Sequence, residues 1–419
     1  MRTLKEWLEH TQAVHALGVD LGLDRVKEVA RRLNLLNPTC PVITIAGTNG
    51  KGSCVAGLEA VYRAQGYKVG AFTTPYLFKH NEQVRIDGDD VEDEWFCQAF
   101  THIEAARGEI TLTQFEFNTL AALYLFHQAN LDVCLLEVGL GGRLDAVNII
   151  EADLAIIASI DLDHVDWLGN TRDLIAIEKA GIMRPARPTV CGDASPPQSL
   201  QAYADEIKSR VYYQGQDYTY QQKKDTWTFR AAAQTYENLP LPSLALQNMA
   251  TVLQAVELLK KRLPVKPESI IKAMRDVKLP GRIQIMPGAV TQIIDVSHNP
   301  AATQFFANKL KTLPCEGKTY AVFSMLADKD IAGSLQAIKD QVDTWFIAEL
   351  AVERGASLGV LEDAFRLAGI KDVETFTDII TAYHAALDEA ESGDRILVFG
   401  SFYTVAGIGE LIVKPKVLS

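Results

Sequence analysis

A glycine-rich segment carries the residue types that hold a nucleotide phosphate. The apolar run 42–46 ends in Gly47-Thr48-Asn49-Gly50-Lys51-Gly52-Ser53. Glycines let the backbone curl so that its N–H groups point inward, and Lys51 adds a positive charge. A helix that follows the loop would direct its positive end at the same anion. These residues predict a site for a nucleoside triphosphate.

The spacing of this loop departs from the common phosphate-loop pattern G-x-x-x-x-G-K-[ST]. Gly47 and Gly50 are only three residues apart, and Gly52 separates Lys51 from Ser53. An ordinary strand-to-helix turn also favours glycine, threonine and asparagine. A β-branched run precedes the loop and a periodic apolar pattern follows it over residues 54–65, which favours a variant phosphate loop over such a turn.

A single carboxylate, Glu137, ends a second apolar run. Residues 133–138 read Val-Cys-Leu-Leu-Glu-Val, and a glycine-rich stretch follows directly. A buried carboxylate is costly without a cation, and Mg²⁺ that bridges nucleotide phosphates takes few protein oxygens. The run therefore predicts a magnesium ligand, with a carboxylate at a helix N-terminus as the alternative.

Two further ionisable residues follow the next predicted strand. His164 lies among three aspartates at positions 161, 163 and 166, where it would ligate a metal or make a hydrogen bond. Lys179 lies in Ile177-Glu178-Lys179-Ala180-Gly181. From the residues alone, we expect Lys179 to be a solvated charge on a helix.

The C-terminal part of the chain repeats the order of strand, polar turn and helix. In Ile293-Ile294-Asp295-Val296-Ser297-His298, we expect Asp295 to accept hydrogen bonds from ribose hydroxyls and His298 to face phosphate. Arg282 precedes them in Leu279-Pro280-Gly281-Arg282, where it would reach a ligand or remain an exposed linker residue.

The elements that must position these groups alternate between strands and helices, which predicts an α/β fold with parallel sheets. Such sheets bind ligands at the carboxyl ends of their strands, where the phosphate loop falls. We place a domain boundary near Leu279, after a cluster of prolines. Short aromatic strands between residues 211 and 241 predict an antiparallel flap. The other predicted strands are Val42–Ala46, Val69–Thr73, Val133–Val138, Leu154–Ser159, Thr189–Cys191, Thr291–Val296, Thr319–Ser324, Thr344–Ala348 and Arg395–Phe399; predicted helices include Leu244–Lys261 and Glu268–Asp276.

Composition bounds the function classes. The chain has 419 residues, of which 48% are hydrophobic and 22% charged, with a net charge of −12. This acidic balance disfavours a nonspecific nucleic-acid binder. Six scattered cysteines without a C-x-x-C pair favour reducing cytoplasm. No apolar run reaches spanning length, and the N-terminus lacks a signal-peptide core, so we expect a soluble protein that does not enter a membrane.

These motifs, in this order, resemble the dihydrofolate synthase/folylpolyglutamate synthase family of the Mur ligase superfamily. The resemblance covers nearly the whole chain. It implies an N-terminal Mur-type ATP-binding domain over residues 1–279 and a C-terminal Rossmann-like glutamate-ligase domain over 280–419, with the reaction in the cleft between them. The segments that carry it are Gly47–Ser53, Thr73–Leu77, Phe115–Phe117, Leu136–Asn148, Ile160–Gly169, Glu178–Arg184, Leu279–Gln284, Asp295–Pro300, Met325–Asp330 and Gly400–Val405.

The resemblance also implies roles for residues of this chain. Lys51 would hold the ATP phosphates, Ser53 and Glu137 a first Mg²⁺, and Glu137 with His164 and Thr74 a second. Lys179 matches a lysine that the family carboxylates with carbon dioxide, which overturns its interpretation as a solvated charge. Four residues match positions that contact ATP: Asn248, Arg282, Asp295 and His298.

Two positions depart from the family pattern. The family usually has serine where Thr74 stands and histidine where Tyr76 stands. Threonine keeps the hydroxyl, whereas Tyr76 would change the nearby pterin-side loop. Phe115 would either pack on the pterin or belong to the hydrophobic core.

The implied reaction is an amide ligation. ATP phosphorylates a substrate carboxylate, and the amine of L-glutamate then attacks the acyl phosphate. Likeness to the proteobacterial type implies a bifunctional, monomeric enzyme of folate biosynthesis and one-carbon metabolism. Dihydropteroate and reduced folates would be its acceptors.

Three alternatives compete with the bifunctional ligase. A folylpolyglutamate synthase without the first activity and a non-catalytic nucleotide-binding protein remain open. A non-catalytic protein would not need His164, Lys179 or the ligand turns of the second domain. Peptidoglycan-precursor Mur ligases carry a nucleotide-sugar domain ahead of the phosphate loop, and the forty-odd residues before Gly47 leave no room for one.

Overall fold

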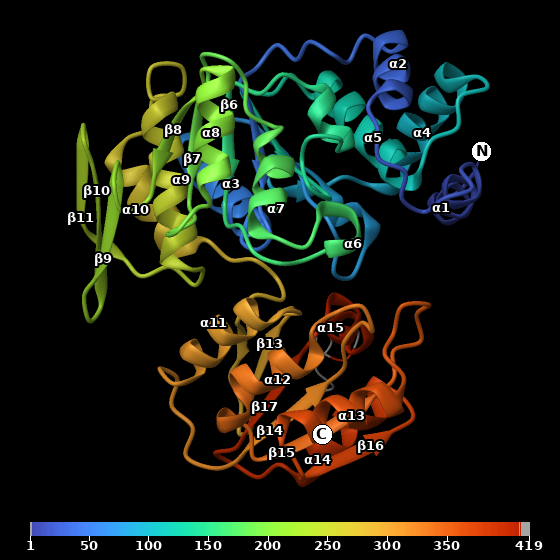
Figure 1. Ribbon diagram of the computed structural model, residues 1–419, viewed down its shortest axis with the longest axis vertical. Coiled ribbons are helices and arrows are strands. Elements are labelled where there is room, and N and C mark those ends of the chain that lie inside the picture. The colour runs from blue at the N-terminus through green and yellow to red at the C-terminus, as the bar shows by residue number, and fades with distance from the viewer. Residues whose placement is uncertain (1, 410, 412–419) are drawn as a thin grey trace. The chain divides into compact units, whose positions relative to one another are not determined.

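Two units make up the chain. A computed structural model describes residues 2–409 and 411 (Figure 1). Contacts divide the chain into Met1–Lys278 and Leu279–Ser419. Each unit is built on one large sheet.

The first unit contains an eight-stranded sheet in the order β4-β3-β2-β5-β1-β6-β7-β8. The six strands β2, β5, β1, β6, β7 and β8 run parallel. The strands β3 and β4 extend the sheet beyond β2 with antiparallel pairing. Apolar residues without alternation form the central strands because both faces of a parallel sheet are buried. The strands are β1 Val42–Ala46, β2 Val69–Phe72, β3 Val84–Ile86, β4 Asp89–Asp90, β5 Val133–Glu137, β6 Leu154–Ile157, β7 Pro188–Cys191 and β8 Arg210–Tyr213.

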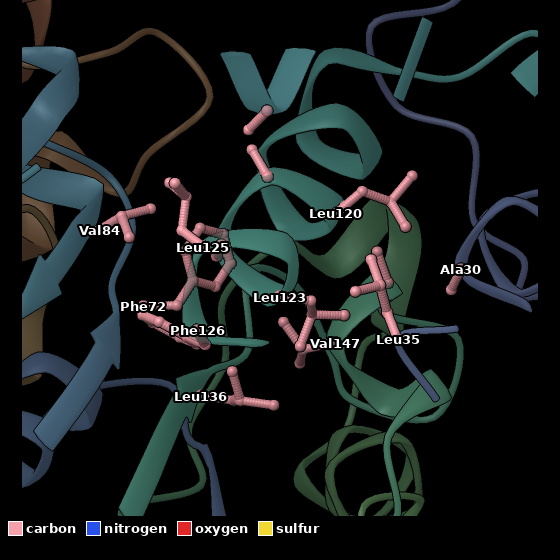
Figure 2. Close-up of a cluster of buried hydrophobic side chains, with 14 of the residues drawn as sticks. Ala30, Leu35, Phe72, Val84, Leu120, Leu123, Leu125, Phe126, Leu136 and Val147 are labelled. Atoms are coloured by element: carbon pink, nitrogen blue, oxygen red, sulfur yellow. The ribbon is translucent and has the colours of Figure 1, made fainter. Parts of the chain in front are cut away.

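Helices cover both faces of this sheet. Helix α3 packs on the central strands and on α9 and α10, whereas α5 contacts β2 and β3 and packs on α4. Figure 2 shows Leu125 and Phe126 of α5 near Phe72 of β2, within the main core cluster. The helices are α1 Leu4–Ala13, α2 Asp24–Arg32, α3 Lys51–Gln65, α4 Asp93–Arg107, α5 Gln114–Ala129, α6 Val165–Leu168, α7 Arg172–Ala180, α8 Gln198–Ile207, α9 Leu246–Leu259 and α10 Pro267–Asp276, with 3₁₀ turns η1 His80–Gln83 and η2 Ala146–Ile149.

A separate three-stranded antiparallel sheet follows β8. It contains β9 Tyr218–Gln222, β10 Thr226–Ala231 and β11 Gln234–Pro240. The sequence prediction placed Tyr212 and Tyr213 in this flap, and that was wrong. Both lie in β8, which pairs in parallel with β7 after the α8 crossover. The crossover determines this pairing, and local aromatic content does not reveal it.

The second unit contains a six-stranded sheet in the order β12-β13-β17-β14-β15-β16. Only β12 is antiparallel to its neighbour. Its strands are β12 Gln284–Met286, β13 Thr291–Asp295, β14 Thr319–Phe323, β15 Thr344–Ala348, β16 Val373–Phe376 and β17 Arg395–Phe399; its helices are α11 Pro300–Leu310, α12 Ile331–Ile338, α13 Leu358–Ala368, α14 Ile379–Glu389 and α15 Phe402–Gly407, with the 3₁₀ turn η3 Lys339–Gln341.

The predicted α/β class is confirmed, and the nine predicted strands of the two large sheets are present to within two residues at each end. The strands β3, β4, β12 and β16 were not predicted, because each has only two to four residues and gives too short a pattern to recognise. None of the helices in the described part of the chain combines the length and apolar character that crossing a membrane requires.

The helix α5, which lies against β2, begins with a buried capping box. The Thr113 hydroxyl accepts a hydrogen bond from the Glu116 N–H at 3.2 Å, and the Glu116 carboxylate accepts one from the Thr113 N–H at 2.7 Å. Thr3 makes the same motif with Glu6 at an exposed position in α1. Buried polar groups that lose a partner cannot bond to water instead.

We therefore expect Thr113→Ala to lower the free energy of unfolding by about 1–2 kcal/mol, and Thr3→Ala by less than about half of that. Urea unfolding followed by circular dichroism measures both. An equal loss in the two variants would show that burial of the box adds nothing.

Candidate functional site

The phosphate loop joins β1 to α3 and has the conformation that its glycines allow. Gly50 caps α3 with a φ of 87°, and a Cβ atom there would lie 2.6 Å from the Asn248 side-chain oxygen. Only glycine fits both the left-handed backbone and this close approach. Asn248, which lies in α9, therefore contacts the loop directly.

Hydrogen bonds tie the loop to the segment that follows β6. The Thr48 N–H donates to the Ser159 carbonyl at 2.9 Å, and the Thr48 hydroxyl accepts from the Asp161 N–H at 3.0 Å. The Asn49 N–H donates to the Ser159 hydroxyl at 3.0 Å. Since β1 and β6 are neighbours, these bonds hold the loop at the carboxyl edge of the sheet.

The helix α3 begins at Lys51, earlier than the predicted Cys54. Lys51, Gly52 and Ser53 therefore form its first turn, whose N–H groups have no partner within the helix. The Lys51 ammonium donates to the Gly47 carbonyl at 3.0 Å, so it lies over the loop. The side chain of Ser53 is buried in the same turn. This arrangement suits an anion.

Glu137 is the last residue of β5 and lies beside Ile45 of β1. It is 4% exposed, and its carboxylate accepts from the Thr74 N–H at 3.3 Å. Thr74, in the loop after β2, is half-buried. No helix starts at Glu137, so the alternative of a helix N-terminal carboxylate is wrong.

His164 stands directly before α6 in a left-handed conformation with a φ of 50°. Its side chain is 38% exposed, and its Nε2 atom lies 3.9 Å from the Asp163 carboxylate. The segment that carries both residues follows Asp161, which is bonded to Thr48 of the phosphate loop. The segment that carries His164 is therefore hydrogen-bonded to the phosphate loop three residues before His164.

Lys179, in the last turn of α7, is buried and not a solvated charge, so the expectation from the residues alone was wrong. Burial and, to a smaller extent, the positive charge of Lys51 lower the pKa of Lys179 to about 7, although Asp163 opposes the shift. Lys179 is thus electrostatically coupled to the phosphate loop and to the His164 segment. Periodicity could not reveal this, because the covering loop is distant in sequence.

The glycine loop after β5 covers the end of α7. A Cβ atom on Gly142 would lie 3.0 Å from the Glu178 carbonyl and 3.2 Å from the Lys179 carbonyl. The Arg143 N–H donates to the Glu178 carbonyl at 2.8 Å. The loop therefore approaches the backbone at the end of α7 closely, and a side chain at position 142 would crowd these carbonyls.

Sequence reasoning missed one carboxylate, Asp145. It is 2% exposed, and its oxygens accept from the N–H groups of Leu140 at 2.8 Å and Val147 at 3.1 Å. Burial raises the pKa of Asp145 to about 6, although these N–H groups and Lys51 oppose the shift. An acid soon after a glycine-rich loop at a strand end was the available signal.

Phe115, near the start of α5, lies on the same side as Asp145. A Cβ atom on Gly139 would meet both the Phe115 ring and the Asp145 carboxylate, at 2.7 and 3.3 Å. Phe115 is only partly buried and packs against the main core and Phe72. It therefore belongs to the core edge, and its contact with a pterin stays a prediction.

Three predicted site residues lie in the second unit and come together there. The Arg282 guanidinium lies over the Phe402 ring at 5.6 Å, and the His298 ring is 6.2 Å from the same ring. The buried Asp295 carboxylate accepts from the Ile283 N–H at 2.9 Å and the Ser297 N–H at 2.8 Å. Arg282 is half-buried and is not an exposed linker residue.

The donor set in the first unit fits a magnesium ion. It offers the Glu137 carboxylate, the hydroxyls of Ser53 and Thr74 and the His164 imidazole. Within residues 2–409 and 411, no three His, Cys, Asp or Glu side chains gather as a metal-binding group. Mg²⁺ at a nucleotide does not require one, because phosphate oxygens and water complete its shell.

Comparison with known proteins decides the family. The model of the Mur ligase, glutamate ligase domain matches residues 281–402. Dihydrofolate synthase/folylpolyglutamate synthase of Escherichia coli K12 is 43% identical over 98% of this chain and 95% of that protein. The chain belongs to the dihydrofolate synthase/folylpolyglutamate synthase family. The resemblance inferred from the motifs is thereby confirmed.

Other members of the dihydrofolate synthase/folylpolyglutamate synthase family agree. The Haemophilus influenzae protein is 40% identical over 96% of both chains. The structure of E. coli FolC in complex with DHPP and ADP has a TM-score of 0.94 at 42% identity, with 98% of each chain covered. A bifunctional synthase with Mn, AMPPNP and L-glutamate bound has a TM-score of 0.93 at 41% identity, with 99% of each chain covered.

The buried Lys179 predicts a pH dependence of stability. Its pKa is about 7 in the folded chain against 10.5 for an exposed lysine, so between these values the unfolded chain binds more protons. The free energy of unfolding should therefore rise with pH in this window, by up to about 1.4 kcal/mol per pH unit. We expect Lys179→Met to remove that contribution.

Urea unfolding at about pH 7 to 9.5 in buffer free of carbon dioxide measures the slope. Lys224→Met, at an exposed position between β9 and β10, is the matched control and should keep the wild-type slope. If the free energy of unfolding rises with pH equally in wild type and Lys179→Met, the pKa of Lys179 is not lowered in the folded chain.

Proposed function

We propose that this chain is an ATP-dependent ligase that joins L-glutamate to dihydropteroate, which forms dihydrofolate, and to the glutamate tail of reduced folates. Identity of 40% or more to bifunctional relatives over nearly the whole chain supports this activity. One structural observation carries the proposal. The phosphate loop and Glu137 lie at the carboxyl ends of the neighbouring strands β1 and β5, and the charge of Lys51 in that loop acts on the buried Lys179.

In the proposed reaction, a carboxylate oxygen of the acceptor attacks the γ-phosphorus of ATP. The bond to the bridging oxygen breaks, and ADP leaves. The amine of L-glutamate then attacks the acyl carbon, and phosphate departs as the amide forms. Such a reaction needs positioning and neutralisation of charge more than covalent catalysis.

The residues of the first unit divide this work. The loop residues Gly47, Thr48, Asn49, Gly50 and Gly52 would surround the phosphates. The Lys51 ammonium and the N–H groups of Gly50 and Gly52 would bind them, because the N–H groups of Thr48 and Asn49 donate to Ser159. Ser53 and Glu137 would hold a first Mg²⁺, and Glu137, Thr74 and His164 a second. When bound, the metal supplies positive charge to the phosphate oxygens. The related structure with Mn and AMPPNP supports a divalent ion and a nucleotide.

We also propose that carbon dioxide carboxylates Lys179. A free amine is required, and a pKa near 7 leaves a large neutral fraction at physiological pH. The amine nitrogen would bond to the carbon of CO₂ and release a proton. The anionic carbamate would then face the positive charge of Lys51, which relieves the repulsion that lowers the lysine pKa.

The remaining assignments extend the same proposal. Residues 1–279 would act as the ATP-binding domain and 280–419 as the glutamate-ligase domain. Asn248 supports this through its contact with Gly50, and Arg282, Asp295 and His298 are the proposed nucleotide contacts of the second unit. We propose that the protein is a monomer. We also propose that it acts in the cytoplasm, since all six cysteines are free.

The activity is tested by ADP formation in Mg-ATP and L-glutamate, with dihydropteroate or tetrahydrofolate as the acceptor. We expect turnover with both acceptors and none without glutamate. Turnover with tetrahydrofolate alone would reduce the function to folylpolyglutamate synthesis. Binding of ATP without turnover would favour the non-catalytic alternative.

Removal of a phosphate or metal contact should abolish ligation while the fold persists. We expect Lys51→Ala and Glu137→Ala to lower kcat by at least about 10²–10³, because each removes a preorganised charge at the transferred phosphoryl group. Lys224→Ala and Glu237→Ala, at exposed positions near and within the three-stranded sheet, are the matched controls. Wild-type turnover in Lys51→Ala or Glu137→Ala, with unchanged circular dichroism, would refute the site.

A further inference from the structure

The loop that follows β2 places a large aromatic ring close to the candidate metal site. Tyr76 lies two residues after Thr74, whose N–H donates to the Glu137 carboxylate at 3.3 Å. Two residues of extended chain span at most about 7 Å. Tyr76 is 43% exposed, so its ring is open to solvent.

The Glu82 carboxylate restrains the backbone of the loop after β2. Glu82 accepts hydrogen bonds from the N–H groups of Leu77 at 2.7 Å, Phe78 at 2.8 Å and Lys79 at 2.7 Å. Leu77, next to Tyr76, is buried. Tyr76 therefore projects from a backbone that is fixed on both sides, by the Glu82 carboxylate and by Glu137.

The Tyr76 ring packs against a row of aromatic side chains that continues into the hydrophobic core. It meets the His80 ring edge-on at 5.7 Å, and His80 meets Phe96 at 5.0 Å. His80 is 6% exposed, and Phe96 is fully buried. Burial lowers the pKa of His80 to about 4, so the imidazole is neutral at physiological pH. The support is therefore an apolar ring contact and not an ion pair.

A rigid, exposed aromatic ring is suited to a planar ring of a ligand. The two proposed acceptors differ in where such a ring lies. In dihydropteroate the reacting carboxylate is attached directly to the benzoyl ring. In a reduced folate a glutamyl residue separates that ring from the reacting carboxylate. Only dihydropteroate brings its ring close when the reacting carboxylate lies beside the metal site.

We propose that Tyr76, supported by His80, is a specificity residue that contacts the benzoyl ring of dihydropteroate and favours this acceptor over reduced folates. The inference rests on the proposed ligase activity and adds to it the part of the acceptor that Tyr76 recognises.

The test compares Tyr76→Leu and Tyr76→Phe in the full chain. We expect Tyr76→Leu to raise the KM for dihydropteroate about threefold to tenfold, and to leave the KM values for tetrahydrofolate and ATP unchanged. Tyr76→Phe keeps the ring and should resemble wild type. Trp95→Leu removes another exposed aromatic side chain, in α4, and is the matched control.

A second measurement does not depend on turnover. Isothermal titration of dihydropteroate into the chain with Mg-ADP should show the same loss of affinity in Tyr76→Leu. Equal effects on both acceptors, or no effect on dihydropteroate, would overturn the inference and leave the ligase assignment standing. Wild-type turnover with tetrahydrofolate alone would also overturn it. Absence of turnover with either acceptor would instead refute the proposed function, while the titration still decides whether Tyr76 contacts dihydropteroate.

Discussion

The site depends on the hydrogen bonds that join the phosphate loop to the segment after β6. Ser159 accepts hydrogen bonds from the N–H groups of Thr48 and Asn49, and the Asp161 N–H donates to the Thr48 hydroxyl. The parallel sheet makes this possible, because it brings the carboxyl ends of β1 and β6 to one edge. One set of bonds therefore joins the phosphate loop to the segment that carries His164.

Burial then determines the charges at that edge. Lys179 and Asp145 are both buried, and each pKa moves toward the neutral form, to about 7 and about 6. The positive charge of Lys51 lowers both pKa values. It therefore favours the neutral form of Lys179 and the ionised form of Asp145. A carbamate on Lys179 would reverse the sign of one of these interactions. The low dielectric of the site makes such a change in charge more effective than it would be in water.

The sequence allowed much of the fold and part of the site to be predicted. Glycines around Lys51, and a lone carboxylate at the end of an apolar run, are local signals, so the phosphate loop and Glu137 could be identified from short segments. The burial of Lys179 could not be, because it depends on packing between segments far apart in sequence, such as the contact of the loop at 142–143 with the end of α7. The same holds for β8, whose partner is determined by a crossover. Long-range packing, and not local propensity, produced the differences.

If the proposed reaction uses no nucleophilic side chain, its selectivity depends on how firmly the backbone and side chains of the site are positioned. Gly50 and Gly142 each bring backbone within contact distance of another element, at Asn248 and at the end of α7. A side chain at position 50 would collide with Asn248, and one at position 142 would crowd the carbonyls at the end of α7. Glu82 restrains the loop after β2 by another means, with three backbone donors on one carboxylate. Because the proposed chemistry depends on geometry at about the ångström scale, these close contacts matter as much as the charged residues that would touch the substrates.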